Sequence, residues 1–95
     1  MHRLALPRGH GMLFVFRQAR PVCFWMHDTL VPLSLAFVNA HGIITKVIRM
    51  QPLSDTRHCS TLPVRYAIET TQAWFSTHAV MAGSTIRLQW RARGS

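Results

Sequence analysis

Apolar and polar side chains alternate along several short stretches of this chain, and turn-forming residues separate the stretches. In the clearest case Leu33, Leu35 and Phe37 alternate with smaller side chains, which is the period of a β-strand with one strongly apolar face. The segment Asn39–Gly42 follows and favours a tight turn, because its glycine adopts positive φ without a steric penalty. Ile43–Met50 is apolar again, so the pattern predicts a two-stranded β-hairpin.

Four further segments carry the branched and aromatic residues that favour strands. They are Met12–Phe16, Val22–Met26, Val64–Thr70 and Thr85–Trp90. The connection Gln18–Pro21 between the first two has the length of a hairpin loop. Gln51–Pro63 is rich in proline, serine and threonine, which predicts the longest loop of the chain.

One short helix is expected at about residues 72–78, with Thr70 or Thr71 as its N-cap. Ala73, Trp74 and Phe75 would anchor this helix on the sheet. Many short strands and a single helix predict a mostly β fold in one domain spanning residues 1–95. We expect a small, partly open β-barrel or a curled antiparallel or mixed sheet.

Charge adds a possible partner to this picture. The net charge is +8, and arginine supplies ten of the eleven basic residues. One interpretation is a solvated basic face in a protein whose arginine content reflects genomic composition. The other is an anionic partner such as nucleic acid, phospholipid headgroups or an acidic protein. Only the end of the chain gathers cations on one side of a predicted strand; there Arg87, Trp90, Arg91 and Arg93 are the candidate anion-binding residues.

No apolar stretch approaches the roughly 20 residues that a membrane-spanning helix needs. The first residues also lack the apolar core and the cleavage site of a secretory signal. As written, the sequence therefore predicts a cytoplasmic protein.

The segment around Trp25 and Met26 is the first candidate for a site, because large apolar groups stand directly beside Asp28 and Thr29. In a structural interpretation Trp25 and Met26 fill the core, while Asp28 and Thr29 cap a turn. In a functional interpretation all four form the wall of a pocket for a small polar ligand or a peptide.

Cys59 is a candidate nucleophile, since Arg57 and His58 beside it can favour the thiolate. Cys23 lies in a predicted strand, where we expect a small buried hydrophobe; in an oxidising compartment it can instead pair with Cys59. The six histidines show no metal-ligand spacing, and the chain has only three carboxylate side chains. We therefore expect no metal site, no cofactor and no catalytic residue other than the Cys59 alternative.

Several strings occur in an order that resembles the bacterial and archaeal family called domain of unknown function 192. They are Gly11–Phe16, Phe24–Leu33, Met50–Pro52, Arg65–Glu69 and the turn at Gly83. The resemblance runs from Met1 to about Leu88. It implies a small β-rich domain of partly open barrel type with one short helix, and no established activity.

This sequence also departs in places from the pattern of the family that it resembles. Relatives begin earlier, so this chain is expected to lack a leading strand, which would expose a sheet edge and allow homo-oligomers. A true start further upstream would instead indicate a periplasmic or exported protein. Relatives usually have lysine and asparagine at His27 and Asp28 and aspartate at Ser34. They often have a cysteine where Leu53 stands, so a disulfide within that loop is not expected here.

Taken together, these observations predict a non-catalytic binding or structural module for an unknown small polar ligand or peptide. The first alternative is anion or nucleic-acid binding by the basic C-terminal segment. The second is a thiol enzyme that uses Cys59.

Overall fold

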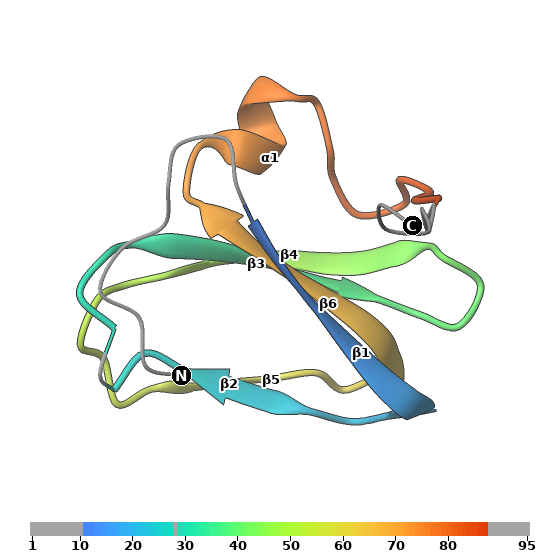
Figure 1. The fold of residues 1–95 in the computed structure, drawn as a ribbon, viewed down its shortest axis with the longest axis horizontal. Coiled ribbons are helices and arrows are strands. Elements are labelled where there is room, and N and C mark those ends of the chain that lie inside the picture. The colour runs from blue at the N-terminus through green and yellow to red at the C-terminus, as the bar shows by residue number, and fades with distance from the viewer. Residues whose placement is uncertain (1–10, 28, 88–95) are drawn as a thin grey trace, which may run out of the picture.

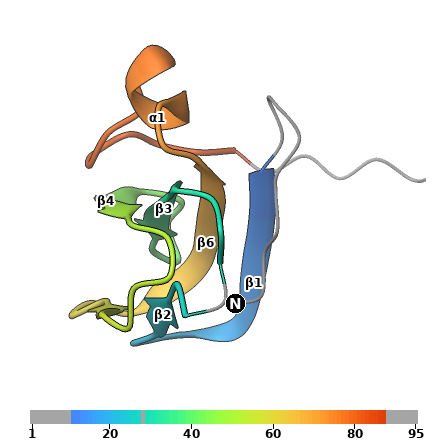
Figure 2. The ribbon, with the colours of Figure 1, turned by 90° about the vertical axis from the view of Figure 1, so that its left-hand side faces the viewer.

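The computed structural model describes residues 11–27 and 29–87, which form two antiparallel sheets and one short helix (Figure 1). The elements are β1 (Gly11–Arg20), β2 (Cys23–Trp25), β3 (Leu33–Val38), β4 (Ile44–Met50), β5 (Arg57–Cys59), β6 (Val64–Thr71) and α1 (Trp74–Thr77). One sheet has the strand order β1-β6-β3-β4 and the other pairs β2 with β5. The predicted mostly β class is confirmed. The strands curl, but those described do not close into a barrel (Figure 2).

The central strand β3 is buried along its whole length. Leu33, Leu35 and Phe37 pack into one cluster together with Met26 and other apolar side chains. The opposite face of β3 packs into a second cluster that includes Phe75 of α1. The sequence predicted one strongly apolar face, and the second face is covered as well because α1 and the chain after it fold over it.

The predicted hairpin of β3 and β4 is confirmed. Gly42 has φ 78°, and its N–H donates to the carbonyl oxygen of Asn39. The Asn39 side-chain oxygen accepts from the N–H groups of His41 and Ile43, which closes the turn. Ile44 and Met50 are the fully buried side chains of β4.

The expected hairpin between the first two strands is wrong. β1 extends to Arg20 and pairs with β6, whereas β2 pairs with β5. Pro21 follows the end of β1 and has no N–H to continue a ladder, so the chain leaves the sheet at that corner (Figure 2). The segment predicted as one long loop contains β5, which consists of only three residues.

The helix is shorter than expected and has no side-chain cap. Thr70 and Thr71 belong to β6, so neither is free to cap α1, and Ala73 takes the N-cap position. Phe75 is buried and anchors the helix, while Trp74 is half-buried and Ala73 is exposed.

The predicted last strand is not present in the part of the chain that the structure describes. Gly83 makes the expected turn with φ 94°, but Thr85 forms only an isolated bridge with Ile43. Residues 88–90 of that strand lie outside the described residues. The start of the chain also lies outside them, and with it the place where the chain is expected to lack the leading strand of its relatives. Among residues 11–27 and 29–87 there is no helix that is long and apolar enough to cross a membrane.

Candidate functional site

Two of the four site residues predicted at the polar corner after β2 lie inside the protein. Met26 and Thr29 are completely buried. The Thr29 N–H donates to the Met26 carbonyl oxygen at 3.0 Å, and the Leu53 N–H donates to the Thr29 carbonyl oxygen at 2.9 Å. Met26 and Thr29 line neither of the two cavities described below. Asp28, the fourth residue expected here, lies outside the described residues.

In the structural interpretation Trp25 fills the core, but its side chain is only half-buried. Phe24 takes the inward position, with its ring centroid 5.2 Å from that of Phe14, and Trp25 on the opposite face of the strand is half-buried. The Arg57 guanidinium lies 4.8 Å from the centre of the Trp25 ring, and the His27 ring stacks on it at 4.9 Å. Trp25 is therefore accessible to a ligand, unlike Met26.

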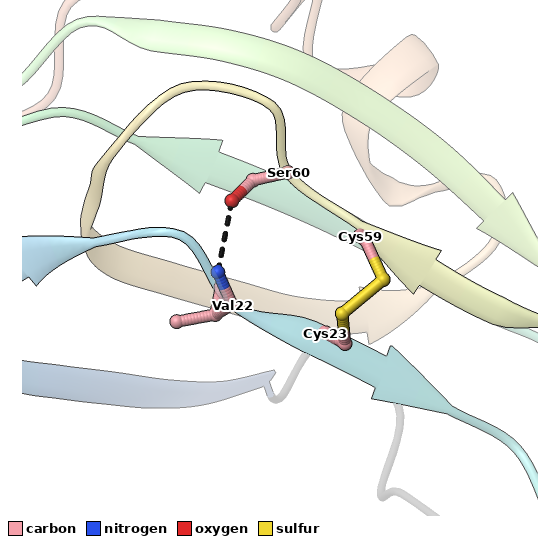
Figure 3. The surroundings of a disulfide bond; sticks show 4 residues. All are labelled: Val22, Cys23, Cys59 and Ser60. Carbon is pink, nitrogen blue, oxygen red and sulfur yellow. Dashed lines mark hydrogen bonds between the residues drawn. A yellow bond between two sulfur atoms is a disulfide. The ribbon is translucent and has the colours of Figure 1, made fainter.

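Cys23 and Cys59 form a disulfide between β2 and β5 (Figure 3). The expectation that Cys23 is a small buried hydrophobe is wrong, since both cysteines lie at exposed positions. In this state Cys59 has no thiol to act as a nucleophile. The pairing was one of the two possibilities for Cys23, but without β5 the sequence offered no reason to place Cys59 opposite it.

A groove lies at the corner where β1 turns into β2. We call it the aromatic groove; its volume is about 480 Å³. Its lining consists of Phe14, Phe16, Arg20, Pro21, Val22, Cys23, Phe24 and Trp25. The Arg20 guanidinium lies 5.5 Å from the centre of the Phe16 ring. Sequence reasoning singled out only Trp25 of these residues, because Met12–Phe16 was recognised as a strand and not as part of a site.

The strand β2 borders this groove, since all three of its residues are in the lining. The Val22 N–H donates to the Ser60 hydroxyl at 3.0 Å (Figure 3). The Ser60 N–H donates to the Val22 carbonyl oxygen at 2.8 Å. Hydrogen-bonded and non-hydrogen-bonded pairs alternate along an antiparallel ladder. Cys23 and Cys59 are then a non-hydrogen-bonded pair, consistent with their Cα separation of 4.0 Å. The N–H and carbonyl groups of Cys23 and Trp25 consequently point away from β5.

A second cavity of about 490 Å³ lies between the sheet and the segment that begins with α1. We call it the Arg49 cavity. It is lined by Ser34, Val47, Arg49, Gln72, Ser76, Ala79, Val80, Met81 and Ala82. These residues come from β3, β4, the chain before α1, α1 itself and the chain after it, so no single motif could have indicated them.

The structure describes only part of the predicted anion-binding site. Arg87 is exposed, while Trp90, Arg91 and Arg93 lie outside the described residues. Within the described ranges no three histidine, cysteine, aspartate or glutamate side chains gather as a metal site would require.

Comparison with known proteins agrees with this fold. The profile of the family DUF192, described as "Uncharacterized ACR", matches residues 1–88. No curated protein matches the chain. A proposed transcription regulator from Sinorhizobium meliloti 1021 is 32% identical, with a TM-score of 0.82 over 90% of this chain and 67% of its own.

A protein of unknown function from Novosphingobium aromaticivorans DSM 12444 is 21% identical, and its likeness concerns the fold alone. Its TM-score is 0.84 over 93% of this chain and 64% of its own. The chain thus spans about two thirds of the length of these two proteins. With the profile match covering nearly the whole sequence, the expected resemblance is confirmed, and this chain belongs to the DUF192 family.

Proposed function

We propose that this chain is a binding module that takes an extended, acidic peptide segment as an added strand along β2. The observation that carries this proposal is an edge of β2, beside the aromatic groove, with which no described strand pairs. Within the described residues β2 hydrogen-bonds only to β5. An exposed edge of this kind offers a row of backbone donors and acceptors to an incoming strand.

The groove supplies pockets for the side chains of such a peptide. Alternate side chains of an added strand point to opposite faces, and those on the groove side would contact Phe16 and Phe24. Aromatic side chains bury large apolar areas and commonly anchor interfaces. The backbone edge therefore gives affinity and the aromatic groove selects apolar residues.

Charge favours an acidic sequence. The exposed guanidinium groups of Arg20 and Arg57 lie over aromatic rings at the groove and at β2, and neither has a carboxylate partner among the described residues. Stacked arginines keep their N–H groups available for bidentate bonds to carboxylates. The net charge of +8 also steers acidic partners toward the protein.

The disulfide supports an oxidising compartment as the place of action. Cytosolic thiols are kept reduced, and stable disulfides occur mainly in periplasmic and secreted proteins. A periplasmic or exported location accordingly agrees better with the Cys23–Cys59 bond than a cytoplasmic one does.

The direct test is titration of the ¹⁵N-labelled protein with the peptide acetyl-Glu-Val-Glu-Phe-Glu-Val-amide, followed by NMR. We expect the largest amide shifts at Cys23 and Trp25. Replacing every glutamate by lysine should abolish binding, and N-methylation of alternate peptide nitrogens should weaken it at least about tenfold by removing the ladder donors.

Matched arginine variants separate a site from general charge. Arg57→Gln and Arg20→Gln should each weaken the peptide several-fold, whereas Arg17→Gln, which removes an exposed arginine outside the groove, should not. Equal losses in all three variants, or unchanged affinity of the N-methylated peptide, would reject strand addition at β2.

Nucleic-acid binding remains the second proposal, motivated by the basic residues Arg87, Trp90, Arg91 and Arg93 and by the relative described as a proposed transcription regulator. It predicts tight oligonucleotide binding at low salt that falls by several decades by about 200 mM salt. A salt-independent titration removes this alternative.

A further inference from the structure

The Arg49 cavity lies apart from the aromatic groove, and the two linings share no residue. One wall is formed by β3 and β4, the other by α1 and the segment after it. Its volume of about 490 Å³ is within the range of small-molecule sites. The Arg49 cavity is therefore a candidate site separate from the aromatic groove.

The sheet wall of this cavity combines one cation with apolar surface. Arg49 stands directly opposite Ser34 in the ladder of β3 and β4, so both side chains point to the same face. Val47, two residues before Arg49, points to that face as well. The guanidinium thus lies at one end of an apolar strip on the sheet.

The other polar side chains of the cavity already donate to backbone carbonyls. The Ser34 hydroxyl donates to the Gln72 carbonyl oxygen at 2.9 Å, and the Gln72 side-chain amide donates to the Met50 carbonyl oxygen at 3.4 Å. The Ser76 hydroxyl donates to the Ala73 carbonyl oxygen at 3.1 Å. Arg49 has no carboxylate partner in the part of the chain that the structure describes, so its guanidinium is the principal donor available to a ligand.

The opposite wall is almost entirely apolar. It consists of Ala79, Val80, Met81 and Ala82 together with the hydroxyl of Ser76. Met81 is 59% exposed, so its side chain is accessible from the cavity side. A ligand with an apolar portion would cover Met81 and remove it from water.

We propose that the Arg49 cavity binds a small organic carboxylate with a short apolar tail. The carboxylate forms a bidentate pair with the guanidinium of Arg49, whose planar fork matches a carboxylate. The tail lies between Val47 on the sheet and Val80 and Met81 on the opposite wall. A single cation among apolar groups suits a monoanion better than a phosphate ester, which would need more donors.

Hexanoate is a suitable probe, with hexanol, hexylammonium and sulfate as comparators, each titrated into the ¹⁵N-labelled protein. We expect hexanoate to shift the amides of Ser34, Gln72 and Val80 in a saturable way. Hexanol should bind at least about tenfold more weakly, because it has no charge for the guanidinium to pair with. Hexylammonium should not bind, and sulfate should bind more weakly than hexanoate.

Variants of the arginine complete the test. Arg49→Gln should weaken hexanoate at least about tenfold, while Arg49→Lys, which keeps the charge and loses the fork, should fall between it and the native protein. Arg17→Gln serves as the matched control, since Arg17 is exposed and lines neither cavity. If Arg49→Gln fails to fold, the comparison of hexanoate with hexanol on the native protein still decides.

Three results would overturn the proposal: no saturable shift with hexanoate, equal affinity for hexanol, or equal losses in the Arg49 and Arg17 variants. None of these results depends on whether the acidic peptide binds at β2.

Discussion

At the C-terminal end of α1, Ala79 adopts the left-handed conformation with φ 55°. The Ala79 N–H donates to the Ser76 carbonyl oxygen at 3.2 Å, and the Val80 N–H donates to the Phe75 carbonyl oxygen at 2.8 Å. This pair of bonds is the Schellman motif, whose left-handed position is usually glycine because a Cβ is unfavourable there.

We expect Ala79→Gly to raise the free energy of unfolding by roughly 0.5–1 kcal/mol, because relief of the left-handed strain exceeds the added entropy of the unfolded chain. Urea denaturation measures the change. Ala82→Gly is the control: Ala82 lies close by, is exposed and has no positive φ, so its substitution should leave stability equal or slightly lower. Loss of stability in Ala79→Gly would contradict this account of the helix end.

Two neighbouring residues, Trp25 and Met26, have opposite environments. Met26 is completely buried in the main core cluster, whereas Trp25 lies half-buried against Arg57 and His27. Met26→Ala should therefore cost about 2–5 kcal/mol of unfolding free energy, since it removes transfer energy and leaves a cavity. Trp25→Ala should cost less, despite the larger side chain. Chemical denaturation of both variants decides, and a greater cost for Trp25→Ala would show that the indole belongs to the core.

At the level of elements, the disulfide holds together a pair of strands that are each three residues long. A two-stranded ribbon is marginal on its own, so the covalent link matters more here than in the larger sheet. It closes a loop between positions that are 36 residues apart in sequence.

Replacing both Cys23 and Cys59 by serine should lower the free energy of unfolding by about 3–4 kcal/mol, the amount expected for a loop of this size. Denaturation with and without dithiothreitol measures it. Reductant should lower the stability of the native protein to about that of the double variant and leave the double variant unchanged. A native protein insensitive to complete reduction would refute a stabilising role for the bond.

Sequence patterns identified the elements whose signal is local. The hairpin of β3 and β4 has alternating strands and the turn Asn39–Gly42 within one continuous segment, and it was predicted correctly. The strand β5 is Arg57-His58-Cys59, which has no apolar period, and it pairs only because β2 lies beside it. The β1–β2 hairpin was wrong for the related reason that β6, more than 40 residues later, competes for β1.

The candidate sites follow the same rule. Trp25 was recognised as a site residue from its local neighbours, but Phe14 and Phe16 join it only through the corner after β1. Arg49 resembled the other scattered arginines until Ser34 and the segment after α1 were placed around it. Composition and local spacing cannot indicate contacts that folding creates between distant segments.

At the scale of the whole molecule, aromatic side chains join the two sheets. The Phe24 ring of β2 lies 5.2 Å from Phe14 of β1 and 6.1 Å from Phe37 of β3, measured between ring centroids. Phe24 is therefore the contact through which the small sheet is attached to the core of the large one.

This arrangement predicts two levels of stability within one domain. The strands β3 and β6 each have two strand neighbours in the large sheet, whereas β2 and β5 pair only with each other among the described strands. Local opening should thus release β2 and β5 before the large sheet unfolds. In native-state hydrogen exchange, the amides of Phe24 and His58 should open at a lower free energy than those of Leu35 and Ala67.

The variant Phe24→Ala tests whether the aromatic contact couples the two levels. It should lower the free energy of opening at the His58 amide by about 3–5 kcal/mol, because it removes the buried ring. The decrease cannot exceed the free energy of opening that this amide has in the native protein. The Leu35 amide should change less, since β3 keeps β4, β6 and the second cluster around Phe75. Equal decreases at His58 and Leu35 would mean that the molecule unfolds only as a whole. The small sheet would then be an integral part of the core, and not an attached unit that can move at the edge of the aromatic groove.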